Sequence, residues 1–167
     1  MTNWGNEATV AKTEVWLTPP SIIRALGDFD LDPCSEEEMP WQVASKKYTE
    51  KDDGLVQEWE GRVFMNPPYG PKLDPFLHKL AEHGNGIALV FARTETRAFF
   101  RNVWPRANAI MFLRGRVRFY RPDGTQGQSS GSPSCLVAYG ENNVKALYDS
   151  GLDGVIITLD GMEEMPK

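Results

Sequence analysis

The sequence predicts an α/β protein whose mostly parallel sheet is covered by helices on both faces. Strand-like segments alternate with helical segments along the chain, several strand-like segments are apolar throughout, and no internal repeat is visible. A strand that is buried on both faces shows as a continuous apolar run, and crossover helices supply the covering layers. The 167 residues are 41% hydrophobic and 25% charged, a composition and length that fit one globular domain over residues 1–167.

The first half of the chain contains two expected helices and two expected strands. Residues 18–27 begin with a proline pair and end at a glycine, which is typical of the first turn and the C-terminal end of a helix. A strand over 29–33 follows directly. Residues 62–66 predict the second strand because they include β-branched and aromatic residues. Residues 71–84 carry apolar side chains at helical spacing and also end at a glycine.

The segment between the first two strands, 34–60, is polar and irregular. We expect one helical turn over 53–59, and Trp41 and Trp59 are the expected packing anchors. The second half of the chain returns to the alternation of strands and helices, with Thr94 or Thr96 as a helix cap. Its expected elements are, in order, strand 86–92, helix 94–104, strands 109–113 and 116–120, a Gly- and Ser-rich loop 121–134, strand 134–140, helix 141–151 and strand 154–160.

Composition limits the classes of function. No apolar run reaches the roughly eighteen residues of a membrane span, and the N-terminal stretch lacks a signal-peptide apolar region, so a cytoplasmic location is expected. Cys34 and Cys135 do not predict a disulfide framework, and no cysteine or histidine cluster has metal-ligand spacing, so no metal is expected. His78 and His83 are five apart on a predicted helix, and we expect both on the surface and on different faces.

Charge is distributed unevenly along the chain. The net charge of -5 argues against holding nucleic acid by bulk electrostatics, and acidic residues gather in 35–38, 50–53 and 162–165. In contrast, residues 93–121 form a basic segment that contains eight arginines and only one acidic residue, Glu95. It favours a polyanionic partner, although a solvated helix and strand would explain some of its members. These arginines are Arg93, Arg97, Arg101, Arg106, Arg114, Arg116, Arg118 and Arg121.

Polar residues directly follow the first two predicted strands. In open α/β sheets ligands bind at the carboxyl ends of the strands, so Asp32 and Asn66 would border one crevice if their strands are neighbours. Asp32 also fits a plain helix cap or turn residue, because Asp-Pro commonly initiates turns. After Asn66, Pro67 and Pro68 remove two backbone donors and fix two φ angles, which holds Asn66 and Tyr69 in a stiff arrangement. This rigidity indicates a functional site at the end of the second predicted strand.

Four motifs in this order resemble the small phage-type DNA N6-adenine methyltransferases, the Dam-like family. They are W-x-T-P at 16–19, D-L-D-P-C at 30–34, D-D-G-L-x-x-x-W at 52–59 and N-P-P-Y at 66–69. The resemblance covers most of the chain. It implies a reduced class I, Rossmann-like methyltransferase fold, S-adenosylmethionine as cofactor, DNA as partner and a phage or prophage protein acting in a bacterial host. One departure is that "DPCSEEEMP" replaces the glycine-rich turn of larger relatives after the first strand.

The resemblance also implies roles for individual residues. Residues at the second strand end would be catalytic, and the N-terminal motif would fold over the methionine end of the cofactor. The first strand end would bind the cofactor as well, and either Asp52 or Asp53 would face its adenosine part. The implied catalytic residues are Asn66, Pro67, Pro68 and Tyr69, and the implied cofactor contacts are Trp16, Thr18, Pro19, Asp32, Pro33, Cys34, Asp52 and Asp53.

The chemistry explains why these residue types suit the reaction. The exocyclic amine of adenine is a poor nucleophile, and two acceptors, the Asn66 side-chain oxygen and the Pro67 carbonyl, would stabilise charge that develops on its nitrogen. Tyr69 would stack on a base that has left the duplex. The amine becomes acidic after methylation, so no strong general base is required. Alternatives are methylation of RNA or of protein glutamine by the same residues, and a catalytically silent nucleic-acid-binding module.

Residues 113–134 are the candidate DNA-binding surface. Alternation puts Arg116 and Arg118 on one face and Val117 on the other, which suits phosphate contacts, while the loop beyond would reach a groove. The competing interpretation is that the arginines only decorate a strand pair. The predicted DNA contacts are Arg114, Arg116, Arg118, Gln126 and Gln128.

Overall fold

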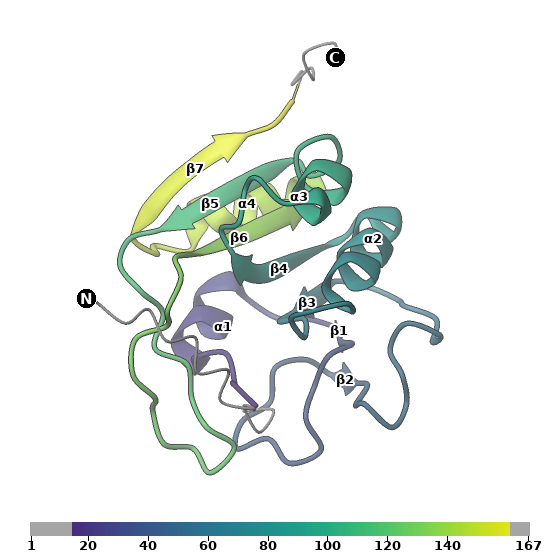
Figure 1. Cartoon of the computed structure of the whole chain (residues 1–167), viewed down its shortest axis with the longest axis vertical. Coiled ribbons are helices and arrows are strands. Elements are labelled where there is room, and N and C mark those ends of the chain that lie inside the picture. Colours follow the sequence, from purple (N-terminus) through teal and green to yellow (C-terminus); the bar gives the residue numbers. More distant parts are fainter. Residues whose placement is uncertain (1–14, 161–167) are drawn as a thin grey trace, which may run out of the picture.

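A seven-stranded sheet runs through the structure, a computed structural model that describes residues 15–160 (Figure 1). The order of the strands is β2-β1-β3-β4-β6-β5-β7. The expected acidic cluster at 162–165 and most of the N-terminal stretch lie outside the described residues. The strands are β1 Leu31–Asp32, β2 Lys46–Lys47, β3 Val63–Met65, β4 Gly86–Phe91, β5 Ala109–Leu113, β6 Ser134–Tyr139 and β7 Gly154–Thr158, and the helices are α1 Pro20–Leu26, α2 Leu73–His83, α3 Arg97–Asn102 and α4 Glu141–Asp149.

The sheet is mixed, so the expectation of a mostly parallel sheet was wrong. The pairs β1–β2, β1–β3 and β3–β4 are parallel, whereas β4–β6, β5–β6 and β5–β7 are antiparallel. Parallel neighbours need a crossover connection, which is usually a helix. The connection from β5 to β6, residues 114–133, contains no helix, and β6 therefore returns beside β5 in the opposite direction. The parallel half of the sheet carries the motifs.

Helices cover both faces of the sheet, as expected. One buried cluster joins apolar side chains of α2 and α3 to one face, and a second joins α1 and α4 to the other. The strands at the centre are buried on both sides, which explains their continuous apolar runs. Trp59 is 9% exposed within the first cluster, and Trp41 packs edge-on against Tyr120. Both tryptophans are packing anchors, as predicted.

Several local predictions were wrong. Residues 116–120 do not form a strand; Tyr120 instead makes isolated bridges with Leu17 and Gln126. The short strand β2 was missed within the irregular segment, and 53–59 forms hydrogen-bonded turns rather than a helical turn. Helix α3 begins only at Arg97, and Thr96 at its N-cap makes no side-chain cap, because its hydroxyl donates back to the Arg93 carbonyl.

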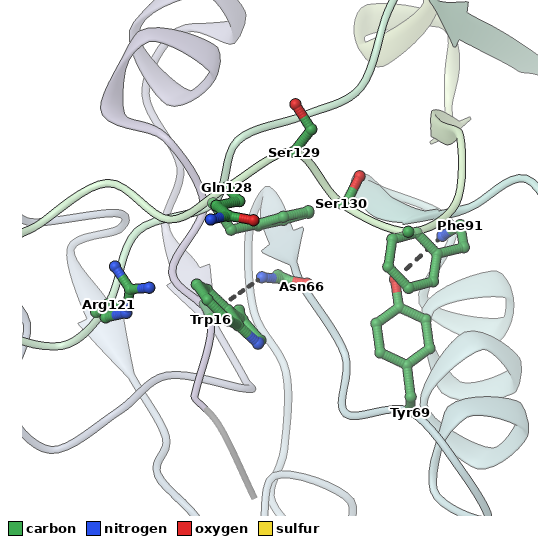
Figure 2. Close-up of a pocket in the computed structure, with 10 residues that line it drawn as sticks. Trp16, Asn66, Tyr69, Phe91, Arg121, Gln128, Ser129 and Ser130 are labelled. Carbon is green, nitrogen blue, oxygen red and sulfur yellow. Dashed lines mark hydrogen bonds between the residues drawn. The ribbon is translucent and has the colours of Figure 1, made fainter. Parts of the chain in front are cut away.

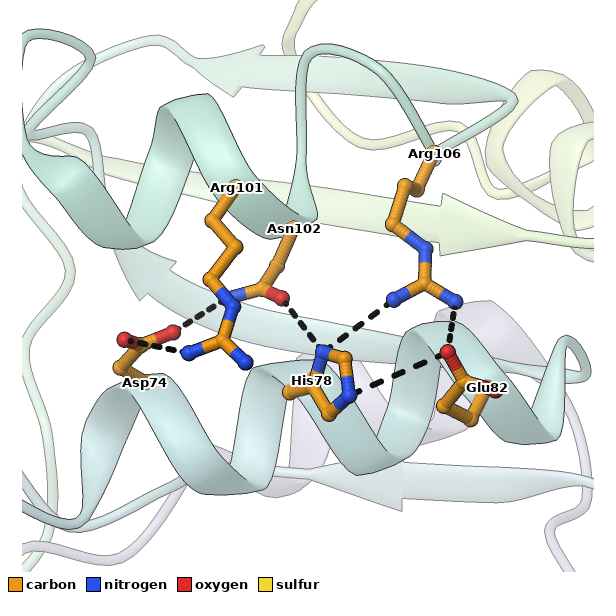
Figure 3. Close-up of polar contacts among 6 residues, drawn as sticks. All are labelled: Asp74, His78, Glu82, Arg101, Asn102 and Arg106. Atoms are coloured by element: carbon orange, nitrogen blue, oxygen red, sulfur yellow. Dashed lines mark hydrogen bonds and ion pairs between the residues drawn. The ribbon is translucent and has the colours of Figure 1, made fainter.

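A polar network connects α2 with α3 and with the residues after α3, and it includes some arginines of the basic segment but not others (Figure 3). Asn102 donates to Asp74 at 2.6 Å and faces His78 Nδ1 at 3.2 Å. His83 contacts the Gly61 carbonyl at 2.7 Å, so both histidines are half-buried and hydrogen-bonded rather than plain surface residues. Three of the eight arginines are paired with acids that lie far away in sequence. The pairs are Arg101–Asp74, Arg106–Glu82 and Arg114–Asp153.

In the part of the chain that the structure describes, no helix is long and apolar enough to cross a membrane. Within residues 15–160 there is also no group of three or more His, Cys, Asp and Glu side chains arranged to hold a metal ion.

Candidate active site

The ends of β1 and β3 lie side by side, as the crevice prediction required. The two strands are parallel neighbours, with Leu31 opposite Val63. Chain order changes direction here, because β2 lies beyond β1 on one side and β4 lies beyond β3 on the other. Ligands in open α/β sheets bind outside the carboxyl ends of strands at such a point. Asp32 is the last residue of β1 and Asn66 directly follows β3.

A cavity of about 440 Å³ opens beside Asn66 (Figure 2). It joins segments far apart in sequence: Trp16 in the segment before α1, the end of β3, the end of β4 and the arm formed by residues 114–133. This volume lies in the range of small-molecule sites. Of the predicted site residues it brings together Trp16, Asn66, Tyr69 and Gln128. Its other lining residues are Phe91, Phe119, Arg121, Ser129, Ser130 and Gly131.

The side-chain amide of Asn66 has a defined orientation. Its Nδ2 donates to the main-chain carbonyl of Trp16 at 3.1 Å. Because that carbonyl only accepts hydrogen bonds, the nitrogen must face Trp16, and Oδ1 is turned to the opposite side, toward Tyr69 (Figure 2). Pro67 is buried and Pro68 is exposed directly after it. Asn66 therefore presents an acceptor, which is the chemical group that its predicted role requires.

Tyr69 projects from the loop after β3 and lies against β4. Its hydroxyl accepts a hydrogen bond from the Phe91 backbone at 3.1 Å, and its side chain is 40% exposed. Partial burial raises the pKa of the Tyr69 phenol to about 12, so the ring is neutral at physiological pH. A neutral aromatic ring with an accessible face can stack on a nucleobase.

Asp32 is a buried carboxyl group below the surface. It is 6% exposed, and its Oδ1 accepts a hydrogen bond from the Cys34 backbone at 3.0 Å. Burial raises the pKa of Asp32 to about 7, although the Cys34 and Ser35 hydrogen bonds and the charge of Lys47 act in the opposite direction. Burial likewise raises the pKa of the Cys34 thiol well above its usual value. Such a carboxyl group is poised to respond to a ligand that donates hydrogen bonds to it.

The two remaining acids differ in their surroundings. Asp52 is exposed and holds a turn, because it accepts hydrogen bonds from the backbone and hydroxyl of Thr49 at 2.8 and 3.1 Å. These bonds lower the pKa of Asp52. Asp53 has a positive φ of 53° and precedes Gly54, where an added Cβ would overlap with the Pro33 carbonyl. The close approach places the motif at 52–59 against Pro33. None of the three acids Asp32, Asp52 and Asp53 lines the cavity.

The N-terminal motif contributes one residue, Trp16, to the cavity. Thr18 and Pro19 are buried, while Trp16 is 36% exposed and lines the cavity. Leu17, between them, exchanges two backbone hydrogen bonds with Tyr120, at 2.7 and 2.9 Å. This pairing ties the segment before α1 to the arm.

The predicted DNA contacts are in different environments. Arg114 is paired with Asp153 and does not line the cavity. Arg116 and Arg118 are exposed while Val117 is 8% exposed, so the predicted alternation is confirmed even without a strand. Arg118 and Gln126 hydrogen-bond within the arm, Arg118 to the Gly127 carbonyl at 3.2 Å. Among the predicted contacts, the structure brings only Gln128 to the cavity wall.

Phe91 and Arg121 belong to the cavity but were not among the predicted site residues. Phe91 ends β4, the neighbour of β3, so the rule that ligands bind at carboxyl strand ends would have found it. Arg121 stood in the basic segment, but its sequence context did not distinguish it from the other arginines. Its guanidinium lies over the Trp16 ring, 5.5 Å from the ring centroid.

The comparisons with known proteins agree with this chemistry. A family model described as DNA N-6-adenine-methyltransferase (Dam) matches residues 5–153 of the chain. This range includes all four motifs, the cavity and the arm. No significant match was found among the curated proteins or the solved structures.

Proposed function

This chain belongs to the DNA N-6-adenine-methyltransferase (Dam) family, and we propose that the cavity beside Asn66 and Tyr69 receives the adenine that is methylated. As a member of the family the chain is a DNA adenine N6-methyltransferase. The family therefore favours DNA as the substrate rather than RNA or protein glutamine, and an enzyme rather than a silent binding module. The observation that carries the proposal is the orientation of the Asn66 amide in the cavity wall, whose nitrogen is bonded to the Trp16 carbonyl and whose oxygen is left as an acceptor.

We propose S-adenosylmethionine as the methyl donor, held at the ends of β1 and β3. The residues present fit such a group. The buried carboxyl group of Asp32 lies at the end of β1, at the switch point between β1 and β3 where the order of the strands changes direction. Gly54 lets the motif at 52–59 approach Pro33 closely. Asp53, next to that glycine, is a better candidate than Asp52, because the Asp53 carboxylate accepts one local hydrogen bond, from the Leu55 backbone at 3.2 Å, whereas Asp52 accepts two from Thr49. When bound, the cofactor supplies an electrophilic methyl group.

The proposed mechanism rests on two acceptors at the end of β3. Asn66 Oδ1 and the Pro67 carbonyl accept hydrogen bonds from the exocyclic amine and stabilise the positive charge that develops on its nitrogen. The prolines hold these acceptors so that little reorganisation is needed during transfer. Tyr69 presents its ring to the flipped base. The proton leaves after transfer, when the amine has become acidic.

The proposed fold class is a reduced class I methyltransferase. Support comes from the parallel half of the sheet, β2-β1-β3-β4, in which the switch point coincides with the two motif-bearing strand ends. The exposed arginines Arg116 and Arg118 and the cavity residue Gln128 are the proposed DNA contacts. The location that goes with this function is the cytoplasm of a bacterial host, with a phage or prophage origin suggested by the resemblance.

The direct test is Asn66→Ala assayed with labelled S-adenosylmethionine on DNA, RNA and total protein in parallel. We expect label in DNA only, and turnover about 10²-fold lower in the variant with nearly unchanged cofactor affinity, because the lost interaction strengthens as charge develops. Asn142→Ala is a matched control, since Asn142 is exposed on α4 and does not line the cavity. Wild-type turnover by Asn66→Ala would reject the catalytic assignment.

A further inference from the structure

The segment before α1 holds the catalytic amide in place through its backbone. Asn66 Nδ2 donates to the Trp16 carbonyl at 3.1 Å, and the next residue, Leu17, is paired with Tyr120 in both directions, at 2.7 and 2.9 Å. An asparagine side chain can turn by half a rotation and exchange its donor for its acceptor. The Trp16 carbonyl removes that freedom, because a reversed amide would bring two acceptors together.

The indole of Trp16 is fixed by two neighbours from the arm. An added Cβ at Gly127 would overlap with Cζ3 of the indole and lie 3.0 Å from Cη2, so only glycine leaves room for the ring. The Arg121 guanidinium lies over the ring at 5.5 Å from its centroid, a cation–π arrangement. Gly127 is itself held by a hydrogen bond from its backbone to the Phe119 carbonyl at 2.7 Å.

We propose that Trp16 is a positioning residue whose main-chain carbonyl orients Asn66 for methyl transfer, with Gly127 and the Leu17–Tyr120 pair keeping that carbonyl in place. The inference deepens the proposed function and rests on the role of Asn66 given there. It makes the arm, which carries the candidate DNA contacts, part of the support of the catalytic amide. Trp16 acts through Asn66 and need not touch the adenine.

Asn66→Asp is a sharp probe of this arrangement. An ionised carboxylate cannot donate to the Trp16 carbonyl and is repelled by it, whereas a protonated carboxyl group donates with one oxygen and keeps the other as acceptor for the amine. Of the groups that line the cavity with this side chain, the Tyr69 phenol is neutral, whereas the Arg121 guanidinium and the sulfonium of the proposed cofactor favour the ionised carboxylate and act against the Trp16 carbonyl. Because the Trp16 carbonyl opposes ionisation, it raises the pKa of the new carboxyl group above the ordinary value of about 4, and we expect kcat of Asn66→Asp relative to wild type to fall as pH rises from 5 to 8.

The ratio to wild type removes titrations that both proteins share, including that of Asp32. Asn66→Ala is the control, and its kcat relative to wild type should be independent of pH. If Asn66→Asp instead shows a pH-independent ratio, the Trp16 carbonyl does not constrain the side chain and the inference is wrong. That result is distinct from failure of the proposed function, which would show as normal turnover by Asn66→Ala.

A second measurement does not depend on activity. The side-chain amide signals of Asn66 can be assigned by NMR from their loss in Asn66→Ala, and a hydrogen bond to the Trp16 carbonyl slows the exchange of its donated proton with water. Gly127→Ala should speed that exchange and lower kcat, and it should change kcat little in the Asn66→Ala background, since Gly127 and Trp16 act only through Asn66. If Gly127→Ala does not fold, Trp16→Leu replaces it, because this variant removes the ring that Gly127 accommodates. The same faster exchange of the Asn66 amide proton and the same lower kcat are expected. Unchanged exchange in the folded variants would overturn the inference.

Discussion

The ring of Tyr69 lies nearly parallel to the ring of Phe91, with 4.5 Å between the centroids and 14° between the planes. The Phe91 backbone also donates to the Tyr69 hydroxyl at 3.1 Å, so the tyrosine is held both at its face and at its tip. One face of Tyr69 is thus backed by Phe91, and its exposed surface remains for a base (Figure 2). A catalytic-motif tyrosine that is fixed in this way loses little freedom when it captures adenine.

Phe91→Leu should therefore weaken capture of the target base. Leucine keeps an apolar side chain and the backbone donor but removes the ring stack, which is worth about 0.5–1.5 kcal/mol. We expect KM for DNA to rise about 2- to 10-fold with a smaller change in kcat. Phe100→Leu is the matched control because Phe100 is 50% exposed on α3 and does not line the cavity. Equal KM values for both variants would show that Phe91 does not support Tyr69.

The buried carboxyl group of Asp32 predicts a pH dependence of stability. Burial raises its folded-state pKa from 3.8 to about 7, so between these values the folded protein holds a proton that the unfolded chain has lost. The free energy of unfolding therefore falls as pH rises from about 4 to about 7, and the full destabilisation, roughly 2–4 kcal/mol, is present above pH 7. Asp32→Asn should lack this decline when urea unfolding is measured across that range. Parallel pH curves for the two proteins would contradict the prediction.

The same titration predicts how cofactor binding depends on pH. If the ionised Asp32 accepts hydrogen bonds from S-adenosylmethionine, binding favours the ionised form and releases a proton near pH 6.5. Affinity measured by calorimetry should increase from pH 6 to pH 8 in the wild type, and Asp32→Asn should bind about 1–3 kcal/mol more weakly at pH 8 without that trend. Proton release is read from the buffer dependence of the binding enthalpy. Wild-type affinity in Asp32→Asn would remove Asp32 from the cofactor site.

The sequence predicted α1, α2 and the motif-bearing ends of β1 and β3 because the signals for them are local, although it missed β2. Proline at the start of α1, glycine after α2 and polar residues at the ends of β1 and β3 each act through the backbone of a few residues. The position of β6 between β4 and β5 depends on pairing of distant segments, which no local pattern encodes. That is why the sheet was expected to be mostly parallel.

The arm shows the same limit at the site itself. Val117 and Phe119 are buried and alternate with exposed arginines, which is the pattern of a strand. Tyr120 of this segment makes only isolated bridges, with Leu17 about a hundred positions earlier and with Gln126, so the segment does not form a strand. The contact of Arg121 with Trp16 in the cavity wall depends on such long-range pairing, so the sequence did not distinguish Arg121 from the other arginines.

Gln128 is the residue of the arm best situated to select the target adenine. It lines the cavity, whereas Gln126 donates to the Arg118 carbonyl at 3.4 Å within the arm. Gln128→Ala should change which adenines are methylated, with discrimination reduced by about 1–3 kcal/mol, the usual value of a good base contact. Sequencing of methylated positions in random DNA measures this, with Gln126→Ala as the control. A target preference altered by Gln126→Ala alone would reverse the assignment.

Two arginines near the start of the arm differ in pairing and therefore in their expected contribution to DNA binding. Arg114 is paired with Asp153 at 3.0 Å, whereas Arg116 is exposed and has no acidic partner among the residues that the structure describes. A phosphate contact releases about one condensed counterion, so Arg116→Ala should reduce the slope of log affinity against log salt by about one and weaken all sequences alike. Arg114→Ala is the matched control and should change the slope less, since Asp153 competes with phosphate for its guanidinium. Binding measured at several salt concentrations gives both slopes. Identical slopes for wild type and Arg116→Ala would exclude Arg116 from the phosphate contacts and leave Arg97 on α3 as the next candidate, because Arg101 on the same helix is paired with Asp74.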